Sequence, residues 1–506
     1  MAGVLGLGAT VATVPGAAAP AEAATAEHGD VVSTTTTSYS IQGLDLPLEA
    51  IQITYRTRNM RGEAVDNVTT VIRPVVPLGA SKVVSYESFY DSLNPADQPS
   101  TVIAGGQGLG AGIVNVETAV IAPLLLQGYT VNIPDTEGQS ADFAAGPEYG
   151  YTTIDSLRAI RQVPATGVGD DAPIGMIGYS GGAIAAEWAA ELAPSYAPEV
   201  ADDLVGTAIG GVLVHPGHNL HYIDGSQVWA GVAPMAIVGI ARAFGVDLQP
   251  YLSDYGKQVF AELQDASIAE VLGAYPGLTW AQLTKPEYAV PESVGPYVEL
   301  ANRLIMGTGG TPTSPMFIGQ GTGGELEGTQ ASADYGTGDG VMIAGDVRAL
   351  AKQYCDRGVT VQYDEYALSH FTATAQWIPS AMTWLTSRFA GIAAPTDCDS
   401  IAAGNSLAPI QAVASSTQAS AVTPHVLSWS KKLRKHARAG RWVAVSPTRV
   451  SGGTATYTWT VGKRVVKQGA SPRLKVRRAW RGKRVRVTVV VPGVGSRRYG
   501  FGSVSR

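Results

Sequence analysis

A GxSxG motif at residues 178–182 constrains this chain more than any other feature of its sequence. It stands between an apolar run, Pro173 to Ile177, and a run of small residues and helix formers, Gly182 to Leu192, which together predict a strand, a tight turn and a helix. Glycines are needed on both sides of the serine because a Cβ in such a turn would clash with the neighbouring backbone. The turn holds the hydroxyl of Ser180 in the open, so we expect Ser180 to be a nucleophile.

The same turn provides half of an oxyanion hole. The backbone of Ser180 points the next amide, that of Gly181, toward the oxygen of an attacked carbonyl, and the dipole of the following helix adds to the stabilisation. The second donor in such sites comes from a loop that leaves an early strand. Residues 87–92 are a loop of this kind after the predicted strand Lys82 to Tyr86, although they contain no HGGG motif.

A chance match is the competing interpretation of the motif, because the chain contains 60 glycines. The residues that follow it argue against chance. Asp339 comes after the predicted strand Pro315 to Gln320, and His370 comes after the next predicted strand, Val359 to Tyr366. There, His370 would accept the proton of Ser180 as a general base, while Asp339 would fix the imidazole tautomer and stabilise its charged form.

Three other acids compete with Asp339. Asp334 and Asp346 flank it in sequence, whereas Asp364 lies inside a predicted strand and is too close to His370 to reach around to it. The position of Asp339 relative to the helix that follows favours it over Asp334.

Predicted strands and helices alternate along the catalytic region, residues 38–400, in a pattern typical of a mostly parallel sheet covered on both faces. With the order serine, acid, histidine, this alternation predicts an α/β-hydrolase fold. Between residues 217 and 306 helical patterns replace the alternation and predict a helical cap over the active-site mouth. The apolar run Val228 to Phe244 would line an acyl pocket or, as an alternative, form a buried core helix.

Three histidines lie close together in the segment His215 to His221. Their spacing matches no common metal signature, and the Pro-Gly pair inside the segment argues against two ligands on one helical face. We therefore predict a loop at the cap entrance and neither a metal site nor a cofactor.

The N-terminal segment, residues 1–37, is interpreted as signal-like or disordered. Met1 to Ala24 is rich in alanine, carries no charge before Glu22 and resembles the apolar region and cleavage site of a secretory signal, although it lacks a basic start. An exported chain would pair its two cysteines, Cys355 and Cys398, and free buried thiols are the alternative. The disulfide would close a loop around His370 and stabilise the fold by roughly 4 kcal/mol.

The charge is divided sharply along the chain. Residues 421–506 hold 21 of the 36 Lys and Arg residues and no Asp or Glu, so residues 1–420 carry the other 15 basic residues against all 42 acidic ones, a net charge of −27. Residues 401–424 have a linker composition. In residues 425–506 apolar and polar residues alternate as they do in β-strands. This pattern predicts a small β-sandwich, an immunoglobulin-like accessory domain. It would adhere to an anionic cell-surface polymer or lipid surface, or serve only as a spacer.

Several segments give the chain a family resemblance. It resembles the secretory lipase family, the α/β hydrolases similar to Candida antarctica lipase A, over roughly residues 50–400, and the matching motifs are Val83–Tyr86 with Tyr90–Ser92, Gln127–Tyr129, Asp135–Gly138, and GYSGGA at 178–183 with Ser195–Glu199. The resemblance implies a triad of Ser180, Asp339 and His370, and an oxyanion hole at Gly181 and Asp91. In the family the acid commonly follows its strand directly, whereas here residues 321–336 intervene.

The sequence thus predicts a secreted serine carboxylester hydrolase, a triacylglycerol lipase or esterase, acting on an ester or acylglycerol through an acyl-enzyme. Two alternatives stay open: a peptidase or acyltransferase with the same triad, because a triad does not choose between amide and ester, and a surface-adhesion protein with a degenerate hydrolase domain. We expect an extracellular protein, either free or associated with the cell wall, without a transmembrane anchor or a nucleic-acid partner.

Overall fold

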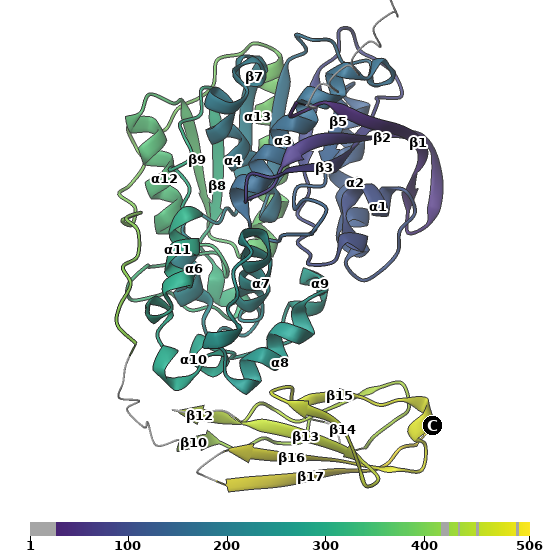
Figure 1. Cartoon of the computed structure of the whole chain (residues 1–506), viewed down its shortest axis with the longest axis vertical. Helices are drawn as coiled ribbons and strands as arrows, with labels where there is room; N and C mark the ends of the chain where they lie inside the picture. Colours follow the sequence, from purple (N-terminus) through teal and green to yellow (C-terminus); the bar gives the residue numbers. More distant parts are fainter. Residues whose placement is uncertain (1–26, 416–424, 434–435, 452–454, 492–494, 506) are drawn as a thin grey trace, which may run out of the picture.

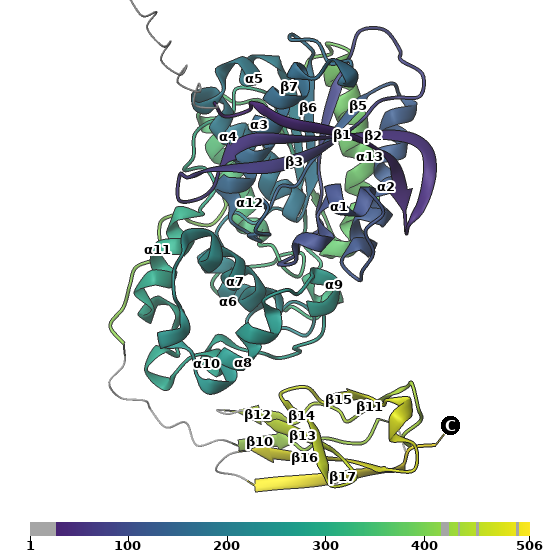
Figure 2. The same ribbon diagram turned by 45° about the vertical axis from the view of Figure 1, so that its right-hand side comes forward.

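A computed structural model describes most of the chain, namely residues 27–415, 425–433, 436–451, 455–491 and 495–505 (Figure 1). The predicted secretory signal, Met1 to Ala24, and the last part of the predicted linker, 416–424, lie outside these residues. Figures 1 and 2 show three parts: a sheet with helices on both faces, a group of helices beside one end of it, and a small group of C-terminal strands.

The sheet contains nine strands in the order β1-β2-β3-β5-β4-β6-β7-β8-β9. Their bounds are β1 Val31–Ile41, β2 Leu44–Arg58, β3 Ala64–Ile72, β4 Val83–Glu87, β5 Thr130–Pro134, β6 Ile174–Tyr179, β7 Leu204–Gly210, β8 Met316–Gly321 and β9 Val361–Tyr366. Strands β4 to β9 pair in parallel, whereas β1, β2 and β3 pair antiparallel and join the sheet through β5. The sheet is therefore mixed: the predicted parallel strands extend to the edge strand β9, and the antiparallel strands form the other side.

Burial explains where the parallel strands lie. Every residue of β4, β5, β6 and β8 is buried because helices cover both faces, and most of these residues are apolar or glycine. Apolar and polar residues alternate at residues 51–56 and 67–72, and these residues lie in the hairpin β2–β3, with Ile51 opposite Val71.

The N-terminal boundary differs from the predicted one. Strand β1 begins at Val31, inside the segment that we assigned to residues 1–37. Most of its side chains are exposed, so it has no apolar alternation, and only its run of β-branched threonines favours a strand.

Two apolar cores lie on opposite faces of the sheet. One lies beneath α3 (Gly146–Gln162), α4 (Gly181–Tyr196), α5 (Pro198–Asp203) and α12 (Ala344–Asp356). The other lies beneath α1 (Pro99–Ile103), α2 (Ala111–Leu126) and α13 (His370–Phe389). The nucleophile turn, at the start of α4, is thus fixed between a buried strand and a buried helix.

The cap, residues 217–306, follows β7 and has an apolar core of its own. Its helices are α6 (Pro216–Ile223), α7 (Val232–Phe244), α8 (Asp254–Leu263), α9 (Ile268–Val271), α10 (Trp280–Leu283) and α11 (Gly295–Arg303). Both ribbon views show these helices together at one end of the sheet (Figures 1 and 2). The helical pattern predicted for this region is confirmed.

Helix α6 corrects the prediction of a loop at His215 to His221. Pro216 is its first residue, where proline is favourable because the missing N–H would have had no partner in the helix. The side chain of His215 accepts a hydrogen bond from the amide of His218 and caps the helix. The Pro-Gly pair therefore starts a helix and does not interrupt one.

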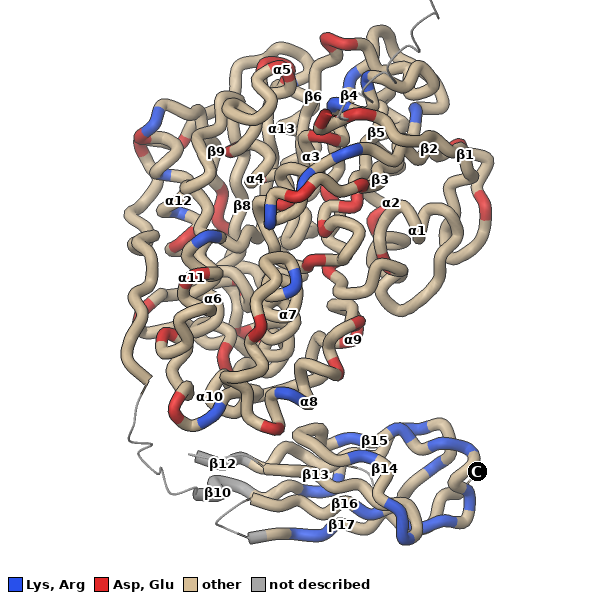
Figure 3. The backbone as a smooth tube through the Cα atoms, viewed as in Figure 1, with Lys and Arg blue, Asp and Glu red and all other residues tan. Residues whose placement is uncertain are grey.

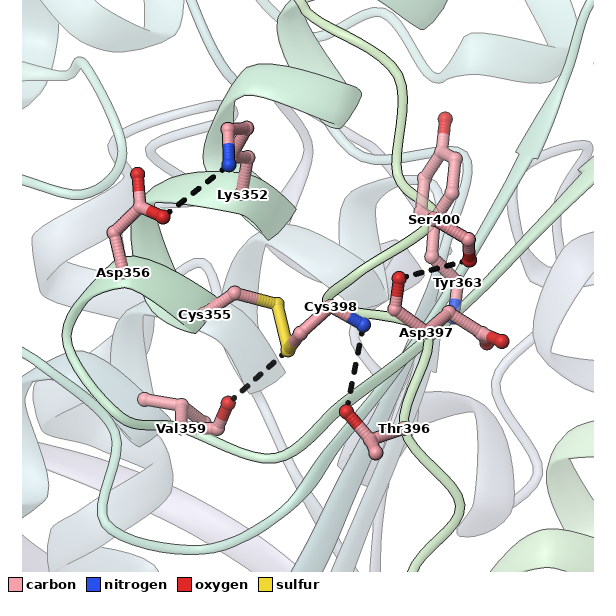
Figure 4. The surroundings of a disulfide bond; sticks show 9 residues. All are labelled: Lys352, Cys355, Asp356, Val359, Tyr363, Thr396, Asp397, Cys398 and Ser400. Carbon is pink, nitrogen blue, oxygen red and sulfur yellow. Dashed lines mark hydrogen bonds and ion pairs between the residues drawn. A yellow bond between two sulfur atoms is a disulfide. The ribbon is translucent and has the colours of Figure 1, made fainter.

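The disulfide between Cys355 and Cys398 is present, with 5.4 Å between the Cα atoms, as predicted (Figure 4). It joins the last turn of α12 to the chain that leaves α13. The loop that it closes contains β9 and His370, so it ties the histidine segment to the helix before β9.

The first part of the predicted linker is packed on the protein. Residues 401–413, which we call the strap, place Ile401 and Leu407 against the core under α12 and Ile410 against the cap core. The side chain of Asn302 donates to the carbonyl of Ile410 and accepts its amide, both at 2.9 Å. The linker interpretation therefore does not hold for residues 401–413, because well-separated apolar residues are partly buried there without any periodicity.

The C-terminal region is a small all-β unit with its own apolar core. A four-stranded antiparallel sheet has the order β14-β13-β16-β17 and is accompanied by the pairs β10–β12 and β11–β15. The strands are β10 His425–Ser428, β11 Trp442–Ala444, β12 Arg449–Ser451, β13 Thr456–Val461, β14 Arg464–Gly469, β15 Arg473–Lys475, β16 Arg484–Val491 and β17 Gly495–Ser503. The run Leu474 to Val491 contains the end of β15, a short 3-10 helix at Arg478–Trp480 and then β16.

Shortening the chain from its C-terminus tests the strap. A chain that ends at residue 415 should keep the melting temperature of the catalytic region, whereas one that ends at residue 400 should melt lower by on the order of 5 °C, because three apolar side chains lose their burial. Both keep the disulfide, so the comparison isolates the strap. Equal melting temperatures would contradict the role given to these contacts.

Candidate active site

Ser180 lies in a strained turn between β6 and α4. Its φ and ψ are +53° and −120°, a conformation that residues with a Cβ rarely adopt. Its amide donates to the carbonyl of Gly210 at 2.9 Å, and its carbonyl accepts the amides of Ala183 and Ile184. Backbone hydrogen bonds on both sides therefore hold the serine in this conformation.

The three glycines of the motif are required by space. A Cβ on Gly178 would lie 2.1 Å from the carbonyl oxygen of Gly182, and one on Gly182 would lie 2.0 Å from that of Glu87. A Cβ on Gly181 would lie 1.7 Å from Oδ1 of Asp91. These distances are far below any real Cβ contact, so each glycine allows a close approach on which the turn depends.

The structure brings Ser180, His370 and Asp339 together. Nε2 of His370 lies 2.8 Å from the hydroxyl oxygen of Ser180, and its Nδ1 lies 2.7 Å from Oδ2 of Asp339. Both His370 and Asp339 are buried. The chain thus aligns a hydroxyl, an imidazole and a carboxylate, the arrangement that activates a serine for attack.

Backbone contacts fix the acid and the histidine. Oδ1 of Asp339 accepts the amides of Val341 and Met342, at 3.0 and 2.7 Å, and so leaves Oδ2 for the imidazole. The amide of His370 donates to the carbonyl of Asp339 at 2.7 Å. The insertion before Asp339 therefore does not displace the acid.

The three competing acids lie elsewhere. Asp334 is exposed, and its amide bonds to Ser332. Oδ2 of Asp346 lies 3.1 Å from Nδ1 of His218, and Oδ2 of Asp364 accepts a hydrogen bond from the hydroxyl of Tyr366. None of them contacts His370.

Glu327 is a buried acid that the sequence analysis did not find. Its Oε1 accepts the amide of Phe371 at 2.9 Å, and its Oε2 accepts Nε1 of Trp229 at 2.8 Å. Trp229 in turn presents its ring to His370 at nearly a right angle, with 5.1 Å between the centroids. Glu327 therefore joins the cap to the first turn of α13. The only sequence feature that could have indicated this role is its position in the insertion, residues 321–336, that precedes Asp339.

The surroundings of His370 favour its charged form. Burial by itself lowers the pKa of the imidazole, but the charge and hydrogen bond of Asp339, with smaller contributions from Glu327 and Asp91, raise it above the ordinary value of 6.5. A histidine that accepts a proton from Ser180 is thus stabilised as the imidazolium that it becomes.

Two amides beside Ser180 can hold an oxyanion. Asp91 and Gly181 line the same cavity as Ser180, and within the described part of the chain neither amide donates to an acceptor. Asp91 has a positive φ of +38° and a buried side chain. Burial raises the pKa of its carboxyl to about 8, against the opposing effect of His370. The two predicted oxyanion residues therefore lie side by side.

Further buried carboxyls surround the loop that carries Asp91. Glu117 accepts hydrogen bonds from the hydroxyl of Ser88, at 2.6 Å, and from the amide of Phe89, at 2.8 Å. Burial raises the pKa of Glu117 and that of Glu87 to about 7, although hydrogen bonds oppose the shift. The loop thus rests on acids that are easiest to bury when they carry a proton.

An apolar cavity lined by Ser180 and Gly181 extends into the cap. Its walls come mostly from α6, α7 and α11 and are aliphatic or aromatic: Leu220, Ile223, Trp229, Val232, Ala233, Ala236, Ile237, Ile240, Leu300 and Ala301. The run Val228 to Phe244 therefore lines a pocket and at the same time belongs to the cap core, so both alternatives of the sequence analysis hold.

The histidines of α6 have other partners. The rings of His215 and His218 stack with 3.6 Å between their centroids, and His221 pairs with Glu292 at 2.6 Å. In the parts of the chain that the structure describes, no group of three or more His, Cys, Asp or Glu side chains is placed to hold a metal ion. Nor does any described helix combine the length and apolar character needed to cross a membrane.

Known proteins resemble this chain over the sheet and the cap. A family model described as secretory lipase matches residues 107–396. Lipase 5 of Candida albicans is 31% identical over 392 residues, which cover 74% of this chain and 80% of that protein. A probable inactive lipase of Mycobacterium tuberculosis is 27% identical over 351 residues, 68% of this chain and 74% of that protein.

Among solved structures, Candida antarctica lipase A in its closed state superposes with a TM-score of 0.66. The identity is 24%, and the match covers 78% of this chain and 89% of that one. At this identity the likeness shows the fold, an α/β hydrolase with a mixed sheet.

A pair of substitutions tests the acid. Asp339→Asn should lower kcat by orders of magnitude, because the asparagine no longer fixes the tautomer of His370 or stabilises its charge. Asp334→Asn, on the exposed loop, is the matched control and should stay close to the unsubstituted chain. Ester turnover and melting temperature of both variants are the measurements. The reverse order of activities would move the acid to Asp334.

The buried carboxyls predict how stability depends on pH. Glu117 has a pKa of about 7 in the fold against an ordinary 4.5, so the folded chain binds a proton more strongly than the unfolded one. Its contribution is fully present below pH 4.5 and is lost as the pH rises toward 7, by up to about 3 kcal/mol for this one group. The melting temperature should therefore fall between pH 5 and 8.

Glu117→Gln keeps the hydrogen bonds to Ser88 and Phe89 without an ionisable group, and should make that fall shallower. Glu49→Gln changes an exposed carboxyl and is the matched control. A melting temperature that rises from pH 5 to 8, or equal slopes for the two variants, would contradict the prediction.

Proposed function

The chain belongs to the secretory lipase family, and from this premise we propose that it is a serine carboxylester hydrolase, a triacylglycerol lipase or esterase. The observation that carries the proposal is the hydrogen-bonded series Ser180, His370 and Asp339 at the mouth of an apolar cavity. The triad alone would indicate only a nucleophilic serine, whereas the apolar cavity beside it favours a substrate with a hydrophobic acyl group.

The proposed reaction has two halves. His370 accepts the proton of Ser180 as its oxygen attacks the ester carbonyl, and the amides of Gly181 and Asp91 bind the oxyanion that forms. Collapse of this intermediate releases the alcohol, which takes the proton from His370, and leaves the acyl group on Ser180. Water then attacks the acyl-enzyme with His370 as base, and the acid is released.

The cavity supports a substrate with a hydrophobic acyl chain. Its walls along α7 are formed by side chains without charge, and Ala233 and Ala236 leave room between the larger ones. Burying each methylene of an acyl chain in such walls contributes about 0.8 kcal/mol. We therefore place the acyl chain in the cap and the alcohol portion toward the opening.

Two alternatives from the sequence remain candidates for the test. A peptidase or an acyltransferase would use the same three residues. The second alternative is a degenerate hydrolase domain without activity. It is a concrete alternative because one relative is named a probable inactive lipase. The intact spacing of 2.7 and 2.8 Å along the triad favours an active enzyme.

The organisation of the whole chain is also a proposal. We assign residues 38–400 to the catalytic domain, with the strap and β1 added to it, and residues 425–506 to a separate immunoglobulin-like domain. Separate apolar cores and the strand pairing support this division. An extracellular location is supported by the family and by the disulfide.

An ester series tests the proposal directly. p-Nitrophenyl esters of increasing acyl length should be hydrolysed, with kcat/KM rising as the chain lengthens into the cavity, while aminoacyl anilides should be turned over far more slowly. Ser180→Ala should abolish hydrolysis and keep the melting temperature. Faster turnover of the anilides would indicate a peptidase, and no turnover of any ester by a folded chain would indicate a degenerate domain.

A further inference from the structure

The C-terminal strands form a unit of one charge sign. Residues 421–506 carry 21 Lys and Arg residues and no Asp or Glu. In Figure 3 the described part of this unit shows blue segments, which are Lys and Arg, and no red ones, which would be Asp and Glu. None of the ion pairs among described residues involves a Lys or Arg from 425–505. So many unneutralised cations repel one another, and an anionic partner would relieve that repulsion.

Backbone hydrogen bonds gather many of these cations at one end. The amide of Val476 donates to the carbonyl of Arg441, and the amide of Lys483 donates to that of Trp480. Arg481 bridges to Val504 beside them. We call the exposed cations on these joined segments the basic end: Arg441, Lys475, Arg477, Arg478, Arg481 and Lys483. Five of the six lie between residues 475 and 483, so the charge is concentrated there.

Tryptophan accompanies the basic end. Trp442 lies directly opposite Lys475 in the antiparallel pair β11–β15, so their side chains share one face, and 44% of Trp442 is exposed. The guanidinium of Arg477 lies over the ring of Trp480, 5.6 Å from its centroid. Tryptophan beside cations suits the headgroup level of a membrane, where its ring meets apolar chains and its N–H stays in the polar layer.

We propose that the basic end binds a lipid surface with anionic headgroups and so brings the hydrolase to its substrate, an inference that rests on the proposed function. Each Lys or Arg near such a surface adds attraction, and arginine binds headgroup phosphates with two hydrogen bonds. An exposed tryptophan ring favours a lipid surface over a soluble polyanion, which offers no apolar layer. The catalytic part, with a net charge of −27 over residues 1–420, would be repelled by the same surface.

Vesicle binding by the full chain tests this inference apart from catalysis. In the Ser180→Ala background no ester is cleaved, so failure of the proposed function cannot be mistaken for failure to bind. The chain should sediment with vesicles of phosphatidylcholine and phosphatidylglycerol at least about tenfold more strongly than with phosphatidylcholine alone. The preference should disappear at about 1 M salt, where the Debye length is about 3 Å.

Two variants with the same charge change locate the site. Arg477, Arg478, Arg481 and Lys483 replaced together by Gln should lower binding to the anionic vesicles at least about tenfold. Lys431, Lys432, Arg497 and Arg498, cations outside the basic end, replaced together by Gln should lower it less than about threefold. Both variants, in the chain that keeps Ser180, should hydrolyse a soluble short-chain ester as before, and their melting temperatures confirm folding.

Each remaining outcome would overturn the inference. Equal losses in the two variants would mean that binding follows net charge and needs no basic end. Equal binding to both kinds of vesicle would exclude recognition of anionic lipid. Binding to soluble polyglutamate but not to vesicles, unchanged by Trp442→Ala, would make the partner an anionic polymer.

Discussion

The backbone of Ser180 is the constraint on which the rest of the site depends. Its φ of +53° is unfavourable for a residue with a Cβ, so it persists only because hydrogen bonds and close glycine contacts hold it on every side. That one conformation places Ser180 and Gly181 in the lining of the cavity and starts α4 behind them. Because β6, β7, β8 and β9 run parallel, the segments that follow β8 and β9 leave the same edge of the sheet as Ser180, and they bring Asp339 and His370 within hydrogen-bonding distance.

Burial of polar groups follows from this arrangement. A cavity with apolar walls excludes water and strengthens the interaction of His370 with Asp339, but the same burial raises the pKa of Asp91, Glu87 and Glu117. The carboxyls around the oxyanion loop therefore make the fold most stable where they hold their protons. The cap adds a second constraint, because it packs on the catalytic core through a few specific links, among them Glu327 with Trp229 and the strap.

Features that depend on local chain geometry could be predicted from the sequence. The turn at Ser180, the alternation of strands and helices around it and the pairing of the two cysteines followed from residue type and spacing. Asp339 was chosen by its place before a helix, and the structure puts it beside His370. Long-range packing was beyond such reasoning. Glu327 acquires its neighbours from two distant segments, and the strap partly buries single side chains without a period. The start of α6 was missed for a local reason, because the Pro-Gly pair was interpreted as a break.

Covalent labelling with a fluorophosphonate, followed by mass spectrometry of the peptides, tests the central claim most directly, because only a serine activated by a neighbouring base reacts quickly with this probe. The account predicts one label per folded chain, on Ser180, lost after His370→Ala or after denaturation. A folded chain that stays unlabelled, or one that carries its label on a different serine, would contradict it.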